Sequence, residues 1–384
     1  MKDYAGVAIV GYGETSYHKQ PIGTPMSYLA EAVRLALADA GIPKSDVDGL
    51  SVASYGLMPD LTSAAAEHLG MAVRWAFHGA FGGCSAVLGI EQGARAIQAG
   101  DAEVVVVAAA DTMDPAKHRQ MITAFNTPIR DYLASYAFGG ANGLIALIQR
   151  RHMHEFGTTR EQLGKLAVTQ RSHALLNPNA LFQKPLSLDE YLNARVIAEP
   201  FGLFDCPLPC SGGGALVLTT NERAAGLPNR PIRMLAAGQM HDYNPDDVVP
   251  VTFGWADFSQ EMYEVAGLGP QDVDVVELYD DYPIMEVIQL EDLGFCSKGD
   301  GGPFVQRTDI SVQGTLPINT GGGILSAGQA GNGAGILAPV EAVRQLRGEG
   351  GRRQVSAARI ALVTGLGTVS YGHILSSAAM LLSA

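Results

Sequence analysis

An internal repeat constrains the fold of this chain more than any other feature of its sequence. Residues 27–56 read as an amphipathic helix, a turn and a short β-branched strand, and residues 258–282 show the same order. The matching positions, each pair 226 residues apart, are Ala40-Gly41 with Ala266-Gly267 and Asp46-Val47-Asp48 with Asp272-Val273-Asp274. A constant offset indicates a duplicated structural unit, because chance similarity does not preserve the spacing between short motifs.

The elements that follow each copy also repeat in order. A Gly-rich turn, a helix and an apolar strand follow the first copy at residues 81–111, and the same three follow the second copy at residues 319–367. Strands that are apolar throughout need helices on both faces of the sheet. We therefore predict an α/β fold with two similar halves, residues 1–230 and 231–384. A stretch at about residues 113–200 is predicted to be an insertion in the first half that caps a pocket.

The charge of the chain limits its partners. A formal net charge of -13 argues against nucleic acid and anionic membranes, which attract clustered positive charge. No apolar stretch reaches the ~18 residues of a membrane span, and the amino terminus lacks the pattern of a secretion signal. The four cysteines are too few for a disulfide framework, and Cys206 and Cys210 lack the second pair that a zinc site needs. We expect a cytoplasmic protein with reduced thiols and no metal.

Cys84 is the first candidate catalytic residue. It lies in the turn Phe81-Gly82-Gly83-Cys84-Ser85-Ala86, directly before a predicted helix. A thiol at a helix amino terminus experiences the positive end of the helix dipole, which lowers its pKa and favours the thiolate. The alternative is a small buried residue, as most free cysteines are. The spacing leaves both interpretations open.

A glycine-rich loop at residues 319–333 is the second candidate. Such a loop can direct backbone N–H groups at a developing oxyanion or approach a pantetheine chain closely. The alternative is a tight turn between packed elements. The predicted binding residues are Asn319, Gly322, Gly323 and Gly328.

Tyr279 is the third candidate, at the carboxyl end of a predicted strand. Asp280-Asp281-Tyr282 follows it, so phenolic and acidic groups that can transfer protons lie together. The alternative is a strand end with solvated aspartates and a packing tyrosine. His373 is a further candidate, because it lies in a second Gly-rich segment, residues 365–373.

Together, these motifs resemble the thiolases of the sterol-carrier-protein-X type over nearly the whole chain. Residues 290–305 and 316–323 are still more similar to the steroid side-chain aldolases, which share the thiolase fold. The resemblance implies a duplicated five-layer α-β-α-β-α architecture and an acyl-CoA substrate. It also implies a homodimer that pairs through the strand at residues 104–111, and a small partner subunit with a zinc ribbon and an OB-fold.

The resemblance also suggests roles for the site residues. Cys84 matches the thiolase nucleophile, although counting back from the following strand places Gly83 there. Tyr279 and Gln329 fall where thiolases have histidines and where the aldolases have tyrosines. The chain therefore has one of the two aldolase tyrosines, and it has a cysteine that those aldolases lack.

Three functions follow. The first is thiolytic cleavage of a bulky, branched, aromatic or steroidal β-ketoacyl-CoA, with CoA as the co-substrate. In this reaction Cys84 attacks the keto carbonyl, and Tyr279 transfers a proton. Gln329 and the glycine-rich loop stabilise the oxyanion. The second is a retro-aldol lyase acting on a β-hydroxyacyl-CoA, in which Tyr279 is the base and no free CoA is consumed. The third is a non-catalytic scaffold subunit. The sequence favours the first, because a cysteine at a helix-start turn is harder to explain structurally than a tyrosine at a strand end.

Overall fold

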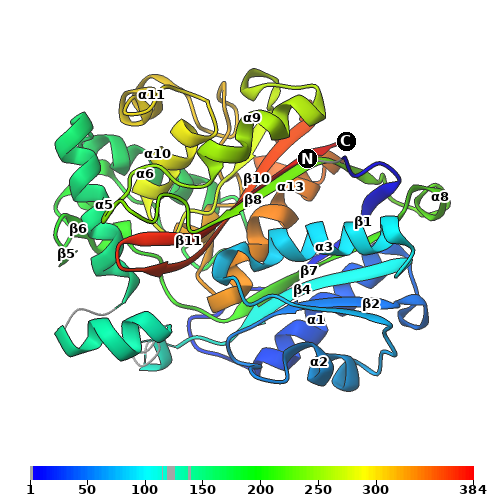
Figure 1. The fold of residues 1–384 in the computed structure, drawn as a ribbon. Coiled ribbons are helices and arrows are strands. Elements are labelled where there is room, and N and C mark those ends of the chain that lie inside the picture. Colours follow the sequence, from blue (N-terminus) through cyan, green and yellow to red (C-terminus); the bar gives the residue numbers. More distant parts are fainter. Residues whose placement is uncertain (1–2, 115, 119–125, 137–139) are drawn as a thin grey trace.

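Nine strands form one mixed sheet in the computed structural model, which describes residues 3–114, 116–118, 126–136 and 140–384 (Figure 1). In spatial order the strands are β3 (Trp75–His78), β2 (Gly49–Ala53), β4 (Val104–Asp111), β7 (Gly212–Thr220), β1 (Val7–Glu14), β8 (Ile232–His241), β11 (His373–Ser383), β10 (Ile360–Ser370) and β9 (Val275–Glu277). The first five belong to the amino-terminal part of the chain and the last four to the carboxy-terminal part. The proposed boundary at residue 230 falls between α8 (Asn221–Ala224) and β8.

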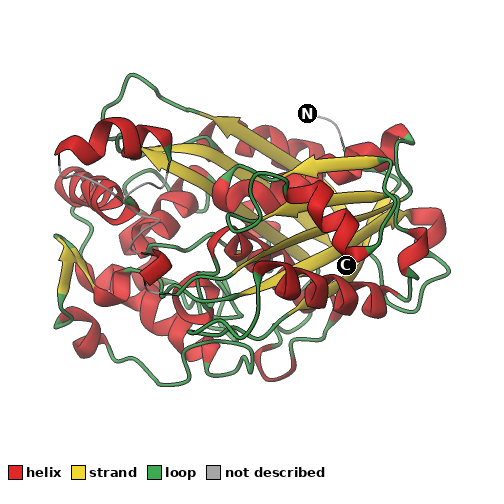
Figure 2. Cartoon of the chain, turned by 90° about the horizontal axis from the view of Figure 1, so that it is seen from below, coloured by secondary structure: helices red, strands yellow, loops and turns green. Residues whose placement is uncertain are grey.

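Helices lie on both sides of the strands and between the two sets of strands (Figure 2). The central helices α3 (Ser85–Ala99) and α13 (Leu337–Arg347) contact strands of both sets. On the outer faces, α1 (Pro25–Ala40) and α2 (Leu61–Leu69) cover the first set, and α9 (Trp255–Ala266) covers the second. This confirms the predicted five-layer α-β-α-β-α architecture.

Strand β4 is apolar from residue 104 to residue 110 because both of its faces are buried. Val105 and Val107 pack into the central core with α3, whereas Val104 and Val106 pack into the outer core beneath α1. Alternate side chains of a strand point to opposite faces, so a strand between two helical layers buries both.

The two copies of the repeat use the same device to join their strands. Asp48 accepts hydrogen bonds from the two backbone N–H groups that lead into β4. Asp274, which lies 226 positions later, accepts from the two N–H groups that lead into β10. Both α1 and α9 end on a glycine in the left-handed conformation, with φ of 67° and 66°. The repeat in the sequence is therefore a repeat of capping and strand-joining chemistry.

The segment between β4 and β7 contains α5 (Ala141–Phe156), α6 (Arg160–Ala174), α7 (Leu188–Leu192) and the two-stranded β5 (Val196–Ala198) and β6 (Phe201–Gly202). It lies beside α10 (Pro283–Asp292), α11 (Gly301–Arg307) and α12 (Gly323–Ala327) at one end of the molecule (Figure 1). Among the described residues, no helix combines the length and apolar character needed to cross a bilayer.

Strand β4 cannot serve as the dimer contact that the sequence suggested. It pairs with β2 along one edge and with β7 along the other, so its backbone hydrogen-bonding groups are used on both sides. The prediction of pairing through residues 104–111 is wrong for this reason. The edge strand on this side of the sheet is β3, which pairs with β2 on one edge.

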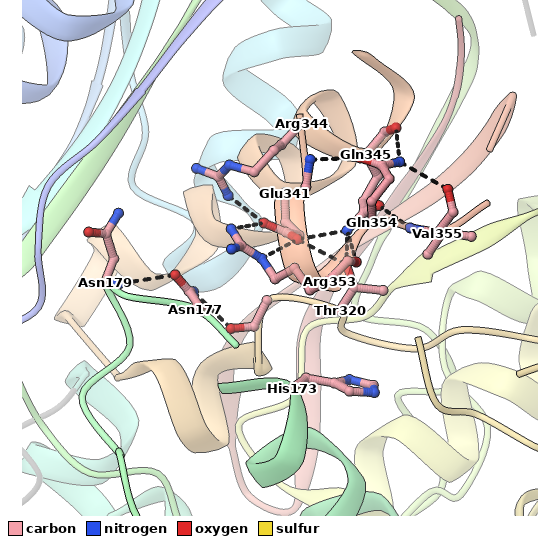
Figure 3. Close-up of polar contacts among 12 residues, drawn as sticks. His173, Asn177, Asn179, Thr320, Glu341, Arg344, Gln345, Arg353, Gln354 and Val355 are labelled. Carbon is pink, nitrogen blue, oxygen red and sulfur yellow. Dashed lines mark hydrogen bonds and ion pairs between the residues drawn. The ribbon is translucent and has the colours of Figure 1, made fainter. Parts of the chain in front are cut away.

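A buried ionic network joins the glycine-rich loop to α13 (Figure 3). Arg353 donates to both carboxylate oxygens of Glu341, at 2.9 and 3.0 Å, and Arg344 donates to the same carboxylate. Thr320, in the loop, contacts Glu341 and donates to Glu277 at the end of β9, at 2.7 Å. Although burial opposes ionisation of Glu341, the two guanidinium groups lower its pKa to about 2. The network therefore fixes the position at which the chain leaves β9.

We predict that Glu341→Gln lowers the free energy of unfolding at pH 7 by about 3–5 kcal/mol, because two buried guanidinium groups lose their anionic partner. Since the pKa of Glu341 is lowered in the folded state, its stabilisation is present above the usual value of 4.5 and is lost as the pH falls towards about 2. Urea denaturation of both proteins across this range measures the difference.

The matched control is Glu199→Gln, which removes an exposed ion pair with Arg150 and should cost less than about 1 kcal/mol. Equal costs for the two substitutions would show that the buried network does not hold the fold together.

Candidate active site

A cavity of about 420 Å³ is lined by segments from both parts of the chain. Its wall comprises the loop after β2, the turn before α3, the first turn of α5, strand β5, the segment after β9, part of the glycine-rich loop and the end of β10. The cavity lies in the size range of sites that enclose small molecules. Among the described residues, no group of three or more His, Cys, Asp or Glu side chains is arranged to hold a metal ion.

Tyr279 lies in the wall of this cavity and its backbone is held in a closed ring of hydrogen bonds. Its N–H donates to Thr364 Oγ1 at 2.8 Å, the Thr364 hydroxyl donates to Gln289 Oε1, and Gln289 Nε2 donates back to the Tyr279 carbonyl at 2.9 Å. Burial, and then the nearby charge of Asp281, raise the pKa of Tyr279 well above its usual value. The phenol therefore stands in the cavity wall as a neutral, firmly positioned proton donor.

Gly83, and not Cys84, faces Tyr279. A Cβ atom at Gly83 would lie 2.1 Å from two ring carbons of Tyr279 and 2.4 Å from the Leu366 carbonyl oxygen, so the ring occupies the space that a side chain at this position would need. Gly83 lines the cavity. This geometry agrees with the count that placed Gly83 at the position of the thiolase nucleophile.

The Cys84 side chain points into the central core. It is fully buried, and its Sγ donates to the Ser376 carbonyl oxygen on β11 at 3.2 Å. It is the last residue of a 3₁₀ turn, η2 (Gly82–Cys84), and does not line the cavity. Burial raises the pKa of Cys84 well above its usual value, in contrast to the lowering that its place before a helix suggested. The geometry thus corresponds to the second interpretation of this residue, a small buried side chain.

The four predicted binding positions of the glycine-rich loop lie behind the cavity wall. Asn319 Oδ1 accepts a hydrogen bond from the Leu278 N–H at 2.7 Å. A Cβ at Gly323 would lie 1.9 Å from a carboxylate oxygen of Asp280, and side chains at Gly322 and Gly328 would also overlap neighbouring atoms. None of the four lines the 420 Å³ cavity. Here glycine serves close packing and left-handed backbone, with φ of 99°, 60° and 141° at the three glycines.

Of the other two predicted catalytic residues, Gln329 lies in the cavity wall and His373 does not. Gln329 lines the cavity, and its Nε2 lies 3.5 Å from the Tyr279 hydroxyl oxygen. His373 begins β11 and lies outside the cavity wall. Of the four predicted catalytic residues, the structure brings together Tyr279 and Gln329.

The cavity wall also contains two polar residues of the cluster that follows Tyr279 in the sequence, and one, Tyr55, that the sequence did not single out. Asp281 is 8% exposed, and Tyr282 donates its hydroxyl to Asn142 Oδ1 on α5 at 2.7 Å. Tyr55, in the loop after β2, lines the wall as well. Tyr55 lies 226 positions before Asp281, so the repeat could have identified it: the same position of each copy faces one cavity.

Comparisons with known proteins agree with this architecture. A family model described as "Thiolase C-terminal domain-like" matches residues 238–383. A protein of Thermomonospora curvata named "Steroid side-chain-cleaving aldolase" is 32% identical over 96% of this chain and 97% of its own length. The chain belongs to the thiolase superfamily. Its place is in the branch of the sterol-carrier-protein-X thiolases and the steroid side-chain aldolases.

Two further relatives describe the range of activities in this superfamily. A "17-hydroxy-3-oxo-4-pregnene-20-carboxyl-CoA lyase" of Mycobacterium tuberculosis is 33% identical over 96% of this chain and 98% of its own length. An "Acetyl-CoA acetyltransferase" of Methanothermobacter thermautotrophicus is 29% identical over 96% of this chain and 99% of its own length. This thiolase-superfamily chain is therefore an enzyme of the acyl-CoA acyltransferase or lyase type.

Among solved structures, one described as an "Ltp2-ChsH2(DUF35) aldolase" superposes with a TM-score of 0.81 at 32% identity, covering 99% of this chain and 98% of the other. The Bacillus anthracis acetyl-CoA acetyltransferase superposes with a TM-score of 0.73 at 14% identity, over 100% of both chains, and so shares the thiolase fold.

We predict that Gly83→Ala in this thiolase-superfamily chain displaces the Tyr279 ring, because the new methyl group meets both that ring and the Leu366 backbone. Activity should fall about 100-fold, since displacements near 1 Å at a reacting group cost about that much. Stability should fall by about 1–3 kcal/mol. Steady-state kinetics and urea denaturation measure the two effects.

The control is Gly226→Ala, where the nearest atom to a new Cβ lies 3.7 Å away and the contact is ordinary. If both alanine variants behave alike, the close approach of Gly83 to Tyr279 has no functional role.

Proposed function

We propose that this chain is an acyl-CoA lyase that breaks the carbon–carbon bond of a β-hydroxyacyl-CoA by a retro-aldol reaction. The observation that carries the proposal is the arrangement at Gly83: the Tyr279 phenol fills the space beside the turn, and the thiol of Cys84 is bonded to the β11 backbone on the far side. The cavity therefore presents a phenol beside the Gly83-Cys84 turn, to which the resemblance assigns the thiolase nucleophile.

The two reactions make different demands on the site. Thiolysis needs a thiolate that attacks the substrate and forms an acyl-enzyme. Retro-aldol cleavage needs only groups that remove the β-hydroxyl proton and return a proton to the α-carbon. Cys206 is the cysteine in the cavity wall, but burial and the charges of Asp205 and Asp281 raise its pKa to about 12. At neutral pH its thiol is protonated, which supports the lyase over the thiolase.

The cavity supports a bulky substrate. A volume of about 420 Å³ and a wall with apolar or aromatic side chains suit a large hydrocarbon or aromatic group on the β-carbon. We propose a branched, aromatic or steroidal β-hydroxyacyl-CoA. Cleavage yields a ketone and a shorter acyl-CoA, so CoA enters and leaves as part of the thioester and no free CoA is consumed. Two relatives at 32% and 33% identity, named as an aldolase and as a CoA lyase, support this assignment.

We also propose that the chain works with other subunits. The description of the solved "Ltp2-ChsH2(DUF35) aldolase" supports a small second subunit for this chain too. The resemblance to this branch suggests a zinc ribbon and an OB-fold in that subunit.

The edge strand β3 is the proposed contact of a homodimer. One side of β3 pairs with β2, and its other side forms the edge of the sheet.

Thiolytic cleavage is the second candidate, supported by the 29% identity to an acetyl-CoA acetyltransferase. It would require Cys84 to leave the Ser376 carbonyl and turn past Gly83 into the cavity. The scaffold role is the third candidate. It would be favoured if the chain showed no activity either with or without a partner subunit.

The experiment compares two assays for the chain with and without a small partner subunit. The first assay follows ketone release from a tertiary β-hydroxyacyl-CoA, and the second follows thiolysis of the matching β-ketoacyl-CoA with free CoA. We expect ketone release without free CoA. Tyr279→Phe should lower it by about 10²–10⁴-fold, because the proton-transfer group is lost, whereas Cys84→Ala should change it less than about threefold.

Activity that depends on free CoA and disappears in Cys84→Ala would overturn the lyase and establish the thiolase. Circular dichroism and thermal unfolding of both variants serve as the folding control, since the Cys84 side chain lies in the core.

A further inference from the structure

Asp281 is a buried carboxyl group in the cavity wall with an unsatisfied oxygen. The residue is 8% exposed, and its Oδ1 has no hydrogen-bond partner within the described part of the chain. A buried carboxyl group without partners costs free energy, and such groups persist where a ligand supplies the missing contact. The neighbouring Asp280 differs, because it accepts from the backbone N–H groups of Ile324 at 2.7 Å and Leu325 at 3.2 Å. Asp280 is therefore held by the backbone of α12, whereas Asp281 lies in the cavity wall and its Oδ1 has no such partner among the described residues.

The surroundings of Asp281 are acidic or neutral. Burial and the charge of Asp280 both raise the pKa of Asp281 well above its usual value. The titratable groups that face it from the adjacent elements are Tyr55 after β2, Cys206 after η5 (Leu203–Asp205), Tyr279, Asp280 and Tyr282 in its own segment, and Glu286 on α10. His118 lines the same cavity, and burial lowers its pKa, which favours the neutral imidazole. In the part of the chain that the structure describes, no basic side chain acts on its charge.

The retro-aldol reaction needs two proton transfers, and the cavity must supply a group for each. A proton leaves the β-hydroxyl and a proton reaches the α-carbon. The Tyr279 phenol is neutral at ordinary pH, because its pKa is raised, so it is suited to give a proton. Gln329, which lies beside it, has an amide that donates and accepts hydrogen bonds but does not exchange protons in this way. A second proton-transfer group must therefore come from elsewhere in the wall.

We propose that Asp281 is a further catalytic residue whose carboxylate removes the proton of the substrate β-hydroxyl, while the Tyr279 hydroxyl delivers a proton to the α-carbon. This inference rests on the lyase function proposed above. The raised pKa is consistent with it, because a carboxylate whose conjugate acid is weak is a stronger base near neutral pH.

The reaction needs no further reactant, because each proton and each electron pair has a donor and an acceptor. The O–H electron pair of the substrate becomes the second bond of the ketone, and the carbon–carbon bond breaks with its electron pair passing to the thioester enolate. The enolate carbon takes the Tyr279 proton. The proton held by Asp281 then returns to the Tyr279 phenolate, which lies close enough for the two charges to interact, and the starting state is restored.

The test is chemical rescue. Asp281→Ala removes the carboxyl group and leaves space at the cavity wall for a small carboxylate. We expect ketone release to fall by about 10²–10⁴-fold in Asp281→Ala and in the isosteric Asp281→Asn, with KM close to that of the wild type. Added formate should raise the rate of ketone release by Asp281→Ala at least about tenfold. It should not change the rate of Asp281→Asn or of Tyr279→Phe.

The pH profile gives a second readout. Because the base must be ionised, wild-type kcat should rise with pH through an apparent pKa above the usual range of aspartate, and this limb should be absent in Asp281→Asn. Asp281→Asn provides these measurements even if Asp281→Ala does not fold.

The outcomes separate this inference from the proposed function. Ketone release by the wild type, with wild-type kcat in Asp281→Asn, would overturn the role of Asp281 and leave the lyase standing. Loss of activity in a folded Asp281→Ala that formate does not restore would also overturn the base role. Absence of ketone release in the wild type, together with thiolysis that depends on free CoA, would overturn the lyase itself.

Discussion

The buried carboxylate of Glu341 is the constraint on which the geometry of this molecule depends. It lies on a central helix, pairs with two guanidinium groups and contacts Thr320 in the glycine-rich loop (Figure 3). Thr320 in turn donates a hydrogen bond to Glu277 at the end of β9. An ionised carboxylate in the interior is stable only when its partners remain in place. The strand end, the loop and the helix are therefore fixed together, and Tyr279, two residues beyond Glu277, emerges from a rigid position.

Rigid placement of Tyr279 has a direct consequence for the opposite wall. Its ring lies where a side chain at residue 83 would stand, so the phenol and a nucleophile at that position exclude each other. Asp281, whose Oδ1 has no hydrogen-bond partner among the described residues, lies in the same wall. The absence of a side chain at residue 83 therefore decides which group faces the cavity at this turn.

Much of the architecture was predictable because short sequence patterns determine the helices, the turns and the ends of the strands. The helices, the strand-joining aspartates and the glycine stops recur at a constant offset, and each forms the same short-range contacts in both copies. Part of the site followed from the same kind of evidence, since Tyr279 stands at a strand end, whereas Gln329 was indicated by the family resemblance. Strand pairing was harder: β4 is apolar because helices cover both faces, and that pattern carries no information about its neighbours in the sheet.

The sequence by itself determined the duplicated α/β fold and the tyrosine that follows β9, because periodicity and motif spacing are properties of the chain alone, and the resemblance of its motifs indicated the superfamily. Only the tertiary structure decided which side chain of the Gly83-Cys84 turn faces the cavity, that the glycines of the loop pack against protein atoms, and that Tyr55 and Asp281 share one wall. The physical reason is that the direction of a side chain depends on the contacts around it. In this molecule those contacts come from segments more than 100 residues away along the chain, such as β11 behind Cys84 and the end of β9 in front of Gly83.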